Sequence, residues 1–212
     1  MRTIEAKVFA VKRLALVTAV FVLALFADAA SAQSPNDIVE EAVALLAERM
    51  EGRKEEFARD KQALYALIDE MLLPRFDRKY AAQLVLGKHW RSADEAQQQR
   101  FIAAFYNSLL QRYADGVLEF DSDRVKVLAF RGDASKKRTT VRTIVKLNDG
   151  TKVAVNYGLV MRDVGWLMFD VTIEGVSYIR NYRAEMDSEI RATSLVAVIE
   201  RLEAKAGIAA HE

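Results

Sequence analysis

The hydrophobic pattern changes its period twice along the chain, and these changes predict helices, then strands, then helices. Between residues 35 and 116, apolar side chains recur three or four positions apart, which is typical of helices with one buried face. Between residues 121 and 175, apolar and polar residues alternate, as in strands with one covered face. The helical spacing returns after residue 177. Helices segregated from antiparallel strands indicate the α+β class.

About six helices are expected from this pattern and its start and stop signals. Ser34 and Pro35 suit the cap and first turn of the first helix. Ser92 and Glu95 have the spacing of a capping box for the fourth. In chain order we expect helices at about 35–50, 64–72, 77–86 and 95–116, one from about 177, and a last one from 193 to near 207.

Four strands are expected at about 125–129, 141–147, 153–161 and 167–173. Asn148-Asp149-Gly150 is a strong hairpin signal between the second and third strands, and Asp163-Val164-Gly165 turns the chain into the fourth. Short turns join antiparallel neighbours, so the strands should form a four-stranded meander with one apolar face. On strict alternation, the residues that point toward this face include Val141, Val145, Val155, Tyr157, Phe169 and Val171.

The fourth helix presents an aromatic and aliphatic stripe to the sheet that follows it. Such stripes most often belong to an ordinary core. However, four apolar strand faces and six helices supply enough apolar surface for a cavity between sheet and helices, and the pattern alone leaves core and cavity open. If a cavity exists, its candidate lining residues are the helical Phe105, Tyr106, Leu109 and Tyr113 together with the strand residues Val141, Val145, Val155, Tyr157, Phe169 and Val171.

The first 32 residues have the three parts of a cleavable secretory signal peptide. A basic start precedes an apolar run at residues 14–26, and small residues end the segment at Ala30-Ser31-Ala32. The run is shorter than the roughly 20 residues that a membrane-spanning helix needs, although an uncleaved anchor remains the alternative. We therefore expect cleavage near Ala32 and a mature chain of residues 33–212 in the periplasm, long enough for a single domain.

Charge and composition exclude several classes of function. Residues 1–32 hold four basic and two acidic side chains, so their removal leaves 27 basic and 28 acidic residues and a net charge of −1. A chain with this charge has no electrostatic feature that would favour binding to nucleic acid. The chain has no cysteine, which removes thiol catalysis and thiolate metal sites. Its two histidines, His89 and His211, are too few for a histidine-rich metal site, and we expect no metal.

The remaining candidates for catalysis are weak. The sequence has no nucleophile-elbow motif for which His89 could act as the general base, so His89 is better explained as a packed or solvated loop residue. Asp170 and Glu174 lie four residues apart and would share a face of a regular strand, where two carboxylates could do acid–base work. Structural hydrogen bonds explain them more simply, so we expect no catalytic residue. Phosphate-binding glycine motifs are also missing from the sequence.

One basic cluster stands in the loop before the second strand. Arg131 and Lys136-Lys137-Arg138 could contact an acidic partner or anionic headgroups, although charge runs are usually solvated surface.

A series of motifs gives the chain a family resemblance that extends over nearly all of residues 33–212. The most specific part is Trp166 followed by the run 169–177, FDVTIEGVS, and then Asn181-Tyr182-Arg183. Earlier parts are Phe76-Asp77, Gly87-Lys88-His89-Trp90, Gln99-Arg100-Phe101 and the run 105–110, FYNSLL. The chain resembles the MlaC family, also called the toluene-tolerance family. It departs from the family pattern at Met186, where an aromatic residue is expected, and at Thr193-Ser194, where a glycine often opens the last helix.

The resemblance implies a soluble periplasmic carrier that holds a glycerophospholipid by its acyl chains and uses no cofactor. It also implies two partners, an outer-membrane lipoprotein–porin complex and an inner-membrane ABC transporter with an MCE protein, and a role in outer-membrane lipid asymmetry. A hopanoid-associated branch of the family leaves the lipid class open. Two other hypotheses remain open. The protein could be an enzyme on a similar cone-shaped α+β fold that uses Asp170 or Glu174, or a lipid-free periplasmic adaptor.

Overall fold

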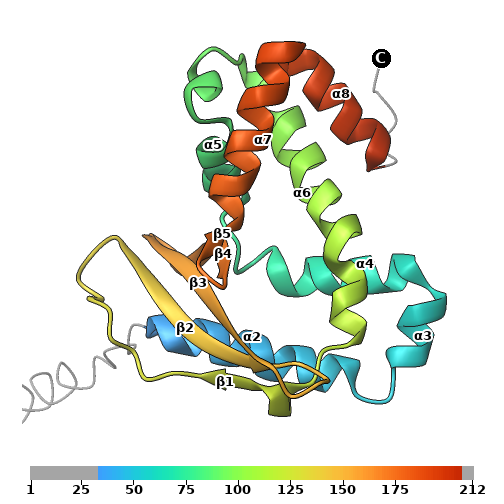
Figure 1. The fold of residues 1–212 in the computed structure, drawn as a ribbon, viewed down its shortest axis with the longest axis vertical. Coiled ribbons are helices and arrows are strands. Elements are labelled where there is room, and N and C mark those ends of the chain that lie inside the picture. Colours follow the sequence, from blue (N-terminus) through green and yellow to red (C-terminus); the bar gives the residue numbers. More distant parts are fainter. Residues whose placement is uncertain (1–32, 207–212) are drawn as a thin grey trace, which may run out of the picture. The chain divides into compact units, whose positions relative to one another are not determined.

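The fold is α+β, with seven α-helices and a five-stranded antiparallel sheet within residues 33–206, the part of the chain that this computed structural model describes (Figure 1). The expected signal peptide at residues 1–32 and the end of the chain at 207–212 lie outside the described residues. Within 33–206, none of the helices is both long enough and apolar enough to span a membrane.

Ser34 caps the first helix, as the sequence predicts. Ser194 caps the last helix, which begins at Leu195, two residues after the predicted start. The cap of the fourth expected helix lies two residues later than predicted, because Asp94 and Gln97 form the capping box in place of Ser92 and Glu95. The helices are α2 (Pro35–Met50), α3 (Lys54–Arg59), α4 (Lys61–Leu72), α5 (Arg78–Leu86), α6 (Glu95–Leu118), α7 (Tyr178–Ala192) and α8 (Leu195–Lys205), with 3₁₀ turns η1 (Gly87–Arg91) and η2 (Ser122–Arg124).

The sheet is a meander in which every strand pairs with its neighbour in the chain, and the strand order is β1-β2-β3-β4-β5. The strands are β1 (Val125–Val127), β2 (Arg138–Lys146), β3 (Lys152–Arg162), β4 (Gly165–Ile173) and β5 (Val176–Ser177). The two-residue β5 was not predicted. It forms because Glu174 and Gly175 both have positive φ, 48° and 81°, which makes a tight hairpin after Ile173.

A β-bulge in β4 corrects one prediction about which face a residue occupies. The register shifts between Gly158 and Leu159, so Gly158 pairs with Asp170 while Leu159 pairs with Met168, and Phe169 is the extra residue. The Phe169 ring therefore lies over Gly158 and packs edge-on against Tyr80 of α5, with ring centroids 5.1 Å apart. Phe169 faces the opposite side of the sheet from Val141, contrary to the strict alternation expected.

The buried side chains form three separate clusters. The first lies among α5, η1, α6, α7 and α8, and includes Trp90, Phe101, Phe105 and Tyr182. The second joins the end of α2 with α3, α4 and α6 around Phe57 and Leu64. The third packs Ile38 and Val39 of α2 on one sheet face, against Val141, Leu159, Trp166 and Met168. Most domains have one contiguous core, so the surfaces between these separate clusters are candidates for a binding site.

Candidate functional site

One sheet face carries a strip of valine and isoleucine side chains that the helices do not cover completely. Strand pairing places Val145 opposite Val153, Val155 opposite Ile173, and Val171 opposite Tyr157, so these side chains share the face of Val141. We define the apolar strip as Val145, Val153, Val155, Val171 and Ile173. Each is half-buried, and among the described residues none of the five belongs to any of the three hydrophobic clusters.

The neighbouring part of the same face shows how completely a helix can cover it. Val141 and Thr143 are 0% exposed, and the Thr143 hydroxyl donates to the backbone oxygen of Val155 at 2.7 Å. Tyr157 packs against the cluster beneath α2, and its burial raises the pKa of the phenol. Among the predicted strand residues, Val141 and Tyr157 thus belong to the α2-covered core, whereas Val145, Val155 and Val171 lie on the half-exposed strip.

The predicted helical residues divide between core and surface. Phe105 is buried, stacked on Phe101 with centroids 5.5 Å apart, and Leu109 packs against the same cluster. Tyr106 donates from its hydroxyl to Asp69 Oδ1 at 2.6 Å, which ties α6 to α4. Its pKa is raised, first by burial and then by that hydrogen bond. These three side chains are held by protein contacts within the helical layers.

Tyr113 is the exception on α6, because its side chain is 39% exposed. Its hydroxyl lies 2.9 Å from that of Tyr182, and its ring packs edge-on against Tyr178 at 5.5 Å. Burial and the hydrogen bond with Tyr182 raise the pKa of Tyr113 to about 12, so it is a neutral phenol at physiological pH. Tyr178 and Tyr182 were not among the predicted candidates, although two tyrosines four apart on a helix could have suggested an aromatic face toward α6.

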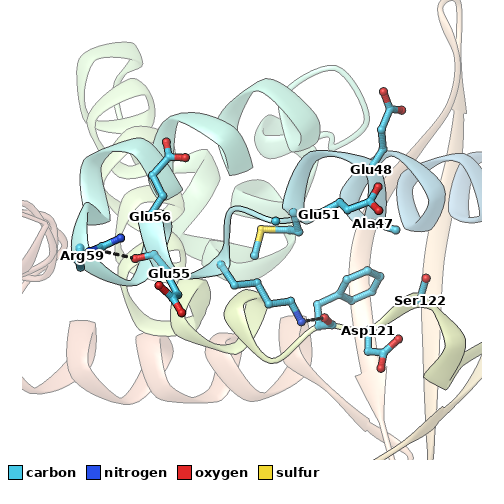
Figure 2. Close-up of a pocket in the computed structure, with 12 residues that line it drawn as sticks. Ala47, Glu48, Glu51, Glu55, Glu56, Arg59, Asp121 and Ser122 are labelled. Carbon is cyan, nitrogen blue, oxygen red and sulfur yellow. Dashed lines mark hydrogen bonds between the residues drawn. The ribbon is translucent and has the colours of Figure 1, made fainter.

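Two pockets of the structure lie elsewhere. A pocket of about 720 Å³ is lined by the end of α2, by α3 and by residues 120–122, which follow α6, and a second of about 530 Å³ lies between α2 and β1. None of the ten predicted cavity residues lines either pocket. The larger one carries the carboxylates Glu48, Glu51, Glu55, Glu56 and Asp121 around Met50 and Phe120 (Figure 2). This acidic lining does not suit an anionic headgroup.

The paired carboxylates have structural partners. Asp170 accepts the Ser177 hydroxyl at 2.6 Å and the backbone N–H of Ile179 at 3.1 Å, which anchors the start of α7. Glu174 lies beyond the end of β4, in the hairpin turn, where its carboxylate accepts the backbone N–H of Ala154 at 2.5 Å. The two side chains therefore do not share a strand face, contrary to the alternative expected from their spacing.

His89 lies in η1 and pairs with a carboxylate 98 residues away in the sequence. Its Nε2 is 2.8 Å from Asp187 Oδ1, and Lys88 Nζ is 2.9 Å from the same oxygen. The hydrogen bond from Lys88, followed by that from His89, lowers the pKa of Asp187 to about 2. This network joins η1 to α7. Within residues 33–206 no group of three His, Cys, Asp or Glu side chains is placed to hold a metal ion.

Comparison with solved structures gives a match to the whole fold. The chain is similar to a phospholipid-binding protein from Ralstonia solanacearum, solved in complex with a phospholipid. The TM-score is 0.73 and the identity 25%, and the match covers 84% of this chain and 98% of that one.

Sequence comparisons agree with the structural match. The chain is 28% identical over 154 residues to the toluene tolerance protein ttg2D of Pseudomonas putida, which covers 72% of this chain and 71% of that protein. It is 22% identical over 94 residues to the intermembrane phospholipid transport system binding protein MlaC of Haemophilus influenzae, 44% of each chain. The family model described as MlaC protein matches residues 40–204. The chain therefore belongs to the MlaC family.

Proposed function

We propose that this protein is a periplasmic carrier that holds a glycerophospholipid by laying its acyl chains on the apolar strip. The observation that carries the proposal is the strip itself: five branched aliphatic side chains share one face, are half-buried, and belong to no cluster of the described core. Water at such a surface is unfavourable, and an acyl chain would replace it with apolar contact.

The energetic need for a carrier follows from the cargo. Each buried CH₂ is worth about 0.8 kcal/mol, so two chains of roughly 16 carbons cost on the order of 25 kcal/mol to expose to water. A protein surface that covers the chains removes much of this cost without covalent chemistry. Binding alone is then sufficient for function, and the structural use of Asp170 and Glu174 supports a carrier rather than an enzyme.

The relatives support the cargo and the transport role. The Ralstonia solanacearum protein was solved with a phospholipid, and the Haemophilus influenzae protein is named for intermembrane phospholipid transport. We extend both properties to this chain. We further propose that it passes lipid between an outer-membrane lipoprotein–porin complex and an inner-membrane ABC transporter with an MCE protein, and so helps to maintain outer-membrane lipid asymmetry.

Export is part of the same proposal. We propose that residues 1–32 are removed at Ala32 and that residues 33–212 act in the periplasm as a single lipid-carrier domain. N-terminal sequencing of protein from the periplasmic fraction should begin at Gln33. Recovery of the full-length chain in the membrane fraction would instead support an uncleaved anchor.

Native mass spectrometry of the purified mature protein tests the carrier function against its alternatives. A carrier should retain a mass that matches a glycerophospholipid from the expression host. An adaptor that binds only proteins should be empty, and an enzyme based on Asp170 or Glu174 should be empty or hold a polar substrate. A retained hopanoid would assign the chain to the hopanoid-associated branch.

A further inference from the structure

Three tyrosines and an arginine form a polar group between α6 and the start of α7. The hydroxyls of Tyr113 and Tyr182 are 2.9 Å apart, and the rings of Tyr113 and Tyr178 pack edge-on at 5.5 Å. The side chain of Tyr178 also hydrogen-bonds to Tyr113, so three hydroxyls share two hydrogen bonds and one O–H donor remains. Tyr182 is 8% exposed and Tyr113 39%, so the group opens to solvent on the side of Tyr113.

This group stands at one end of the apolar strip. Ser177 of β5 pairs with Thr172 of β4, which lies between Val171 and Ile173 of the strip, and Tyr178 follows Ser177 as the first residue of α7. Val171 is a member of the strip and pairs in turn with Tyr157. Tyr178, and with it Tyr113 of α6, therefore lies one residue beyond the β4–β5 ladder that borders the strip.

Arg112 adds a positive charge at the same place. Its guanidinium carbon is 5.7 Å from the centre of the Tyr113 ring. The pKa of Arg112 is raised, first by its electrostatic interaction with Tyr182 and then by that with Tyr113. Glu185 also acts on this charge, but across residues 33–206 Arg112 forms no ion pair with a carboxylate. One of its N–H groups bonds to Tyr182, and the remaining N–H donors are available to an anion.

We propose that Arg112, with the Tyr113–Tyr182 hydroxyl pair, binds the phosphate of a glycerophospholipid whose acyl chains lie on the apolar strip. This inference rests on the proposed carrier function and adds a residue that distinguishes lipids by their headgroup. A phosphodiester offers only acceptor oxygens and a negative charge near the glycerol, which suits a guanidinium and a phenol O–H. The acidic pocket at the end of α2 offers the opposite charge.

The test is a competition between a phosphate-bearing and a phosphate-free lipid. Delipidated mature protein is loaded from mixed micelles with equal amounts of phosphatidylglycerol and a diacylglycerol of the same chains, and the bound ratio is measured by mass spectrometry. Wild type should prefer phosphatidylglycerol, and Arg112→Gln should reduce this preference about three- to tenfold, the value of an ion pair of roughly 1 kcal/mol. Diacylglycerol binding should remain. Arg91→Gln is the matched control, because Arg91 is an exposed arginine of η1, outside the sheet and outside the Tyr113–Tyr182 pair.

The outcomes separate this inference from the carrier function. An unchanged ratio in Arg112→Gln, or a wild type with no preference, overturns the phosphate site while the protein still binds lipid. A wild type that takes up neither lipid overturns the carrier function itself. Binding of glycerol 3-phosphate measured alone, with the same dependence on Arg112, would assign the site to soluble phosphates and overturn the lipid assignment. Tyr113→Phe should lower the preference in the same direction by removing a donor, and no effect of that change would count against the hydroxyl pair.

Discussion

Asp170 and Ser177 are joined by a 2.6 Å hydrogen bond in which the serine hydroxyl donates to the carboxylate, and this contact fixes where α7 leaves the sheet. The other carboxylate oxygen accepts the N–H of Ile179 in the first turn of α7, where a negative charge is favourable at a helix start. The residues that carry the family's most specific motif thus hold two structural layers together.

Asp170→Asn should destabilise the fold without removing any enzymatic turnover. The amide cannot accept at both positions and carries no charge, so we expect a loss of about 1–2 kcal/mol in the free energy of unfolding, measured by urea melts. Asp163→Asn, in the exposed hairpin tip, is the control and should change stability by less than about 0.5 kcal/mol. A hydrolytic activity that disappears with Asp170→Asn would support the enzyme alternative.

Bulky substitutions should separate the apolar strip from the α2-covered core. Val155→Trp and Val145→Trp lie on the strip, and delipidated protein should stay within about 1 kcal/mol of wild type while bound lipid falls severalfold. Val141→Trp occupies a position that is 0% exposed and should cost about 1–3 kcal/mol or more through overpacking. Both quantities come from one preparation, by denaturant melts and lipid extraction. If the strip variants unfold and their folded remainder keeps its full lipid load, the strip is ordinary core.

Substitution by alanine should destabilise the fold at Gly87 and stabilise it at Gly116. Gly87 has φ 56° and ψ −115°, which an L-residue rarely adopts, and an added Cβ would lie 2.7 Å from Arg183 Nε. Gly87→Ala should therefore lose about 1–3 kcal/mol. Gly116 lies inside α6 with no atom within 4 Å of an added Cβ, so Gly116→Ala should gain about 0.5–1 kcal/mol. Thermal melts of the two variants, side by side, check the contrast.

The Asp187 network should make stability depend on pH at the acid end. The folded-state pKa of about 2 lies below the ordinary value of 3.8, so the stabilisation is complete above about pH 4 and is lost as pH falls toward 2. Asp187→Asn should remove this part of the pH dependence. The measurement is the urea midpoint from pH 2 to pH 7. Equal slopes for wild type and variant between pH 4 and pH 2 would mean that Asp187 is not linked to folding.

The sequence predicted the order of the elements because their signals are local. Asn148-Asp149-Gly150 marks the β2–β3 hairpin, and Ser34 caps the first described helix. It did not predict α3, which has six residues and one buried side chain, Phe57, and is too short for a periodic pattern. It also missed β5, whose two residues depend on a turn with positive φ at Glu174.

The candidate site was harder to predict because it depends on contacts between distant segments. Alternation placed Phe169 with Val171, but the bulge beside Gly158 turned Phe169 toward Tyr80. Helical spacing grouped Phe105 with Tyr113, yet one is held in the helical core and the other is exposed beside Tyr178. Spacing gives the direction of a side chain from its own element, and only tertiary packing decides what covers it.

The most direct test of the carrier account is photo-crosslinking with a phospholipid that carries a photoactivatable group near the end of one acyl chain. Delipidated mature protein is loaded, irradiated and digested, and the labelled peptides are identified by mass spectrometry. The account predicts labels in strands β2, β3 and β4 at or beside Val145, Val155 and Val171, with much less in Val155→Trp. Labels confined to the pocket around Glu48 and Glu55, or a folded protein that takes up no lipid, would contradict it.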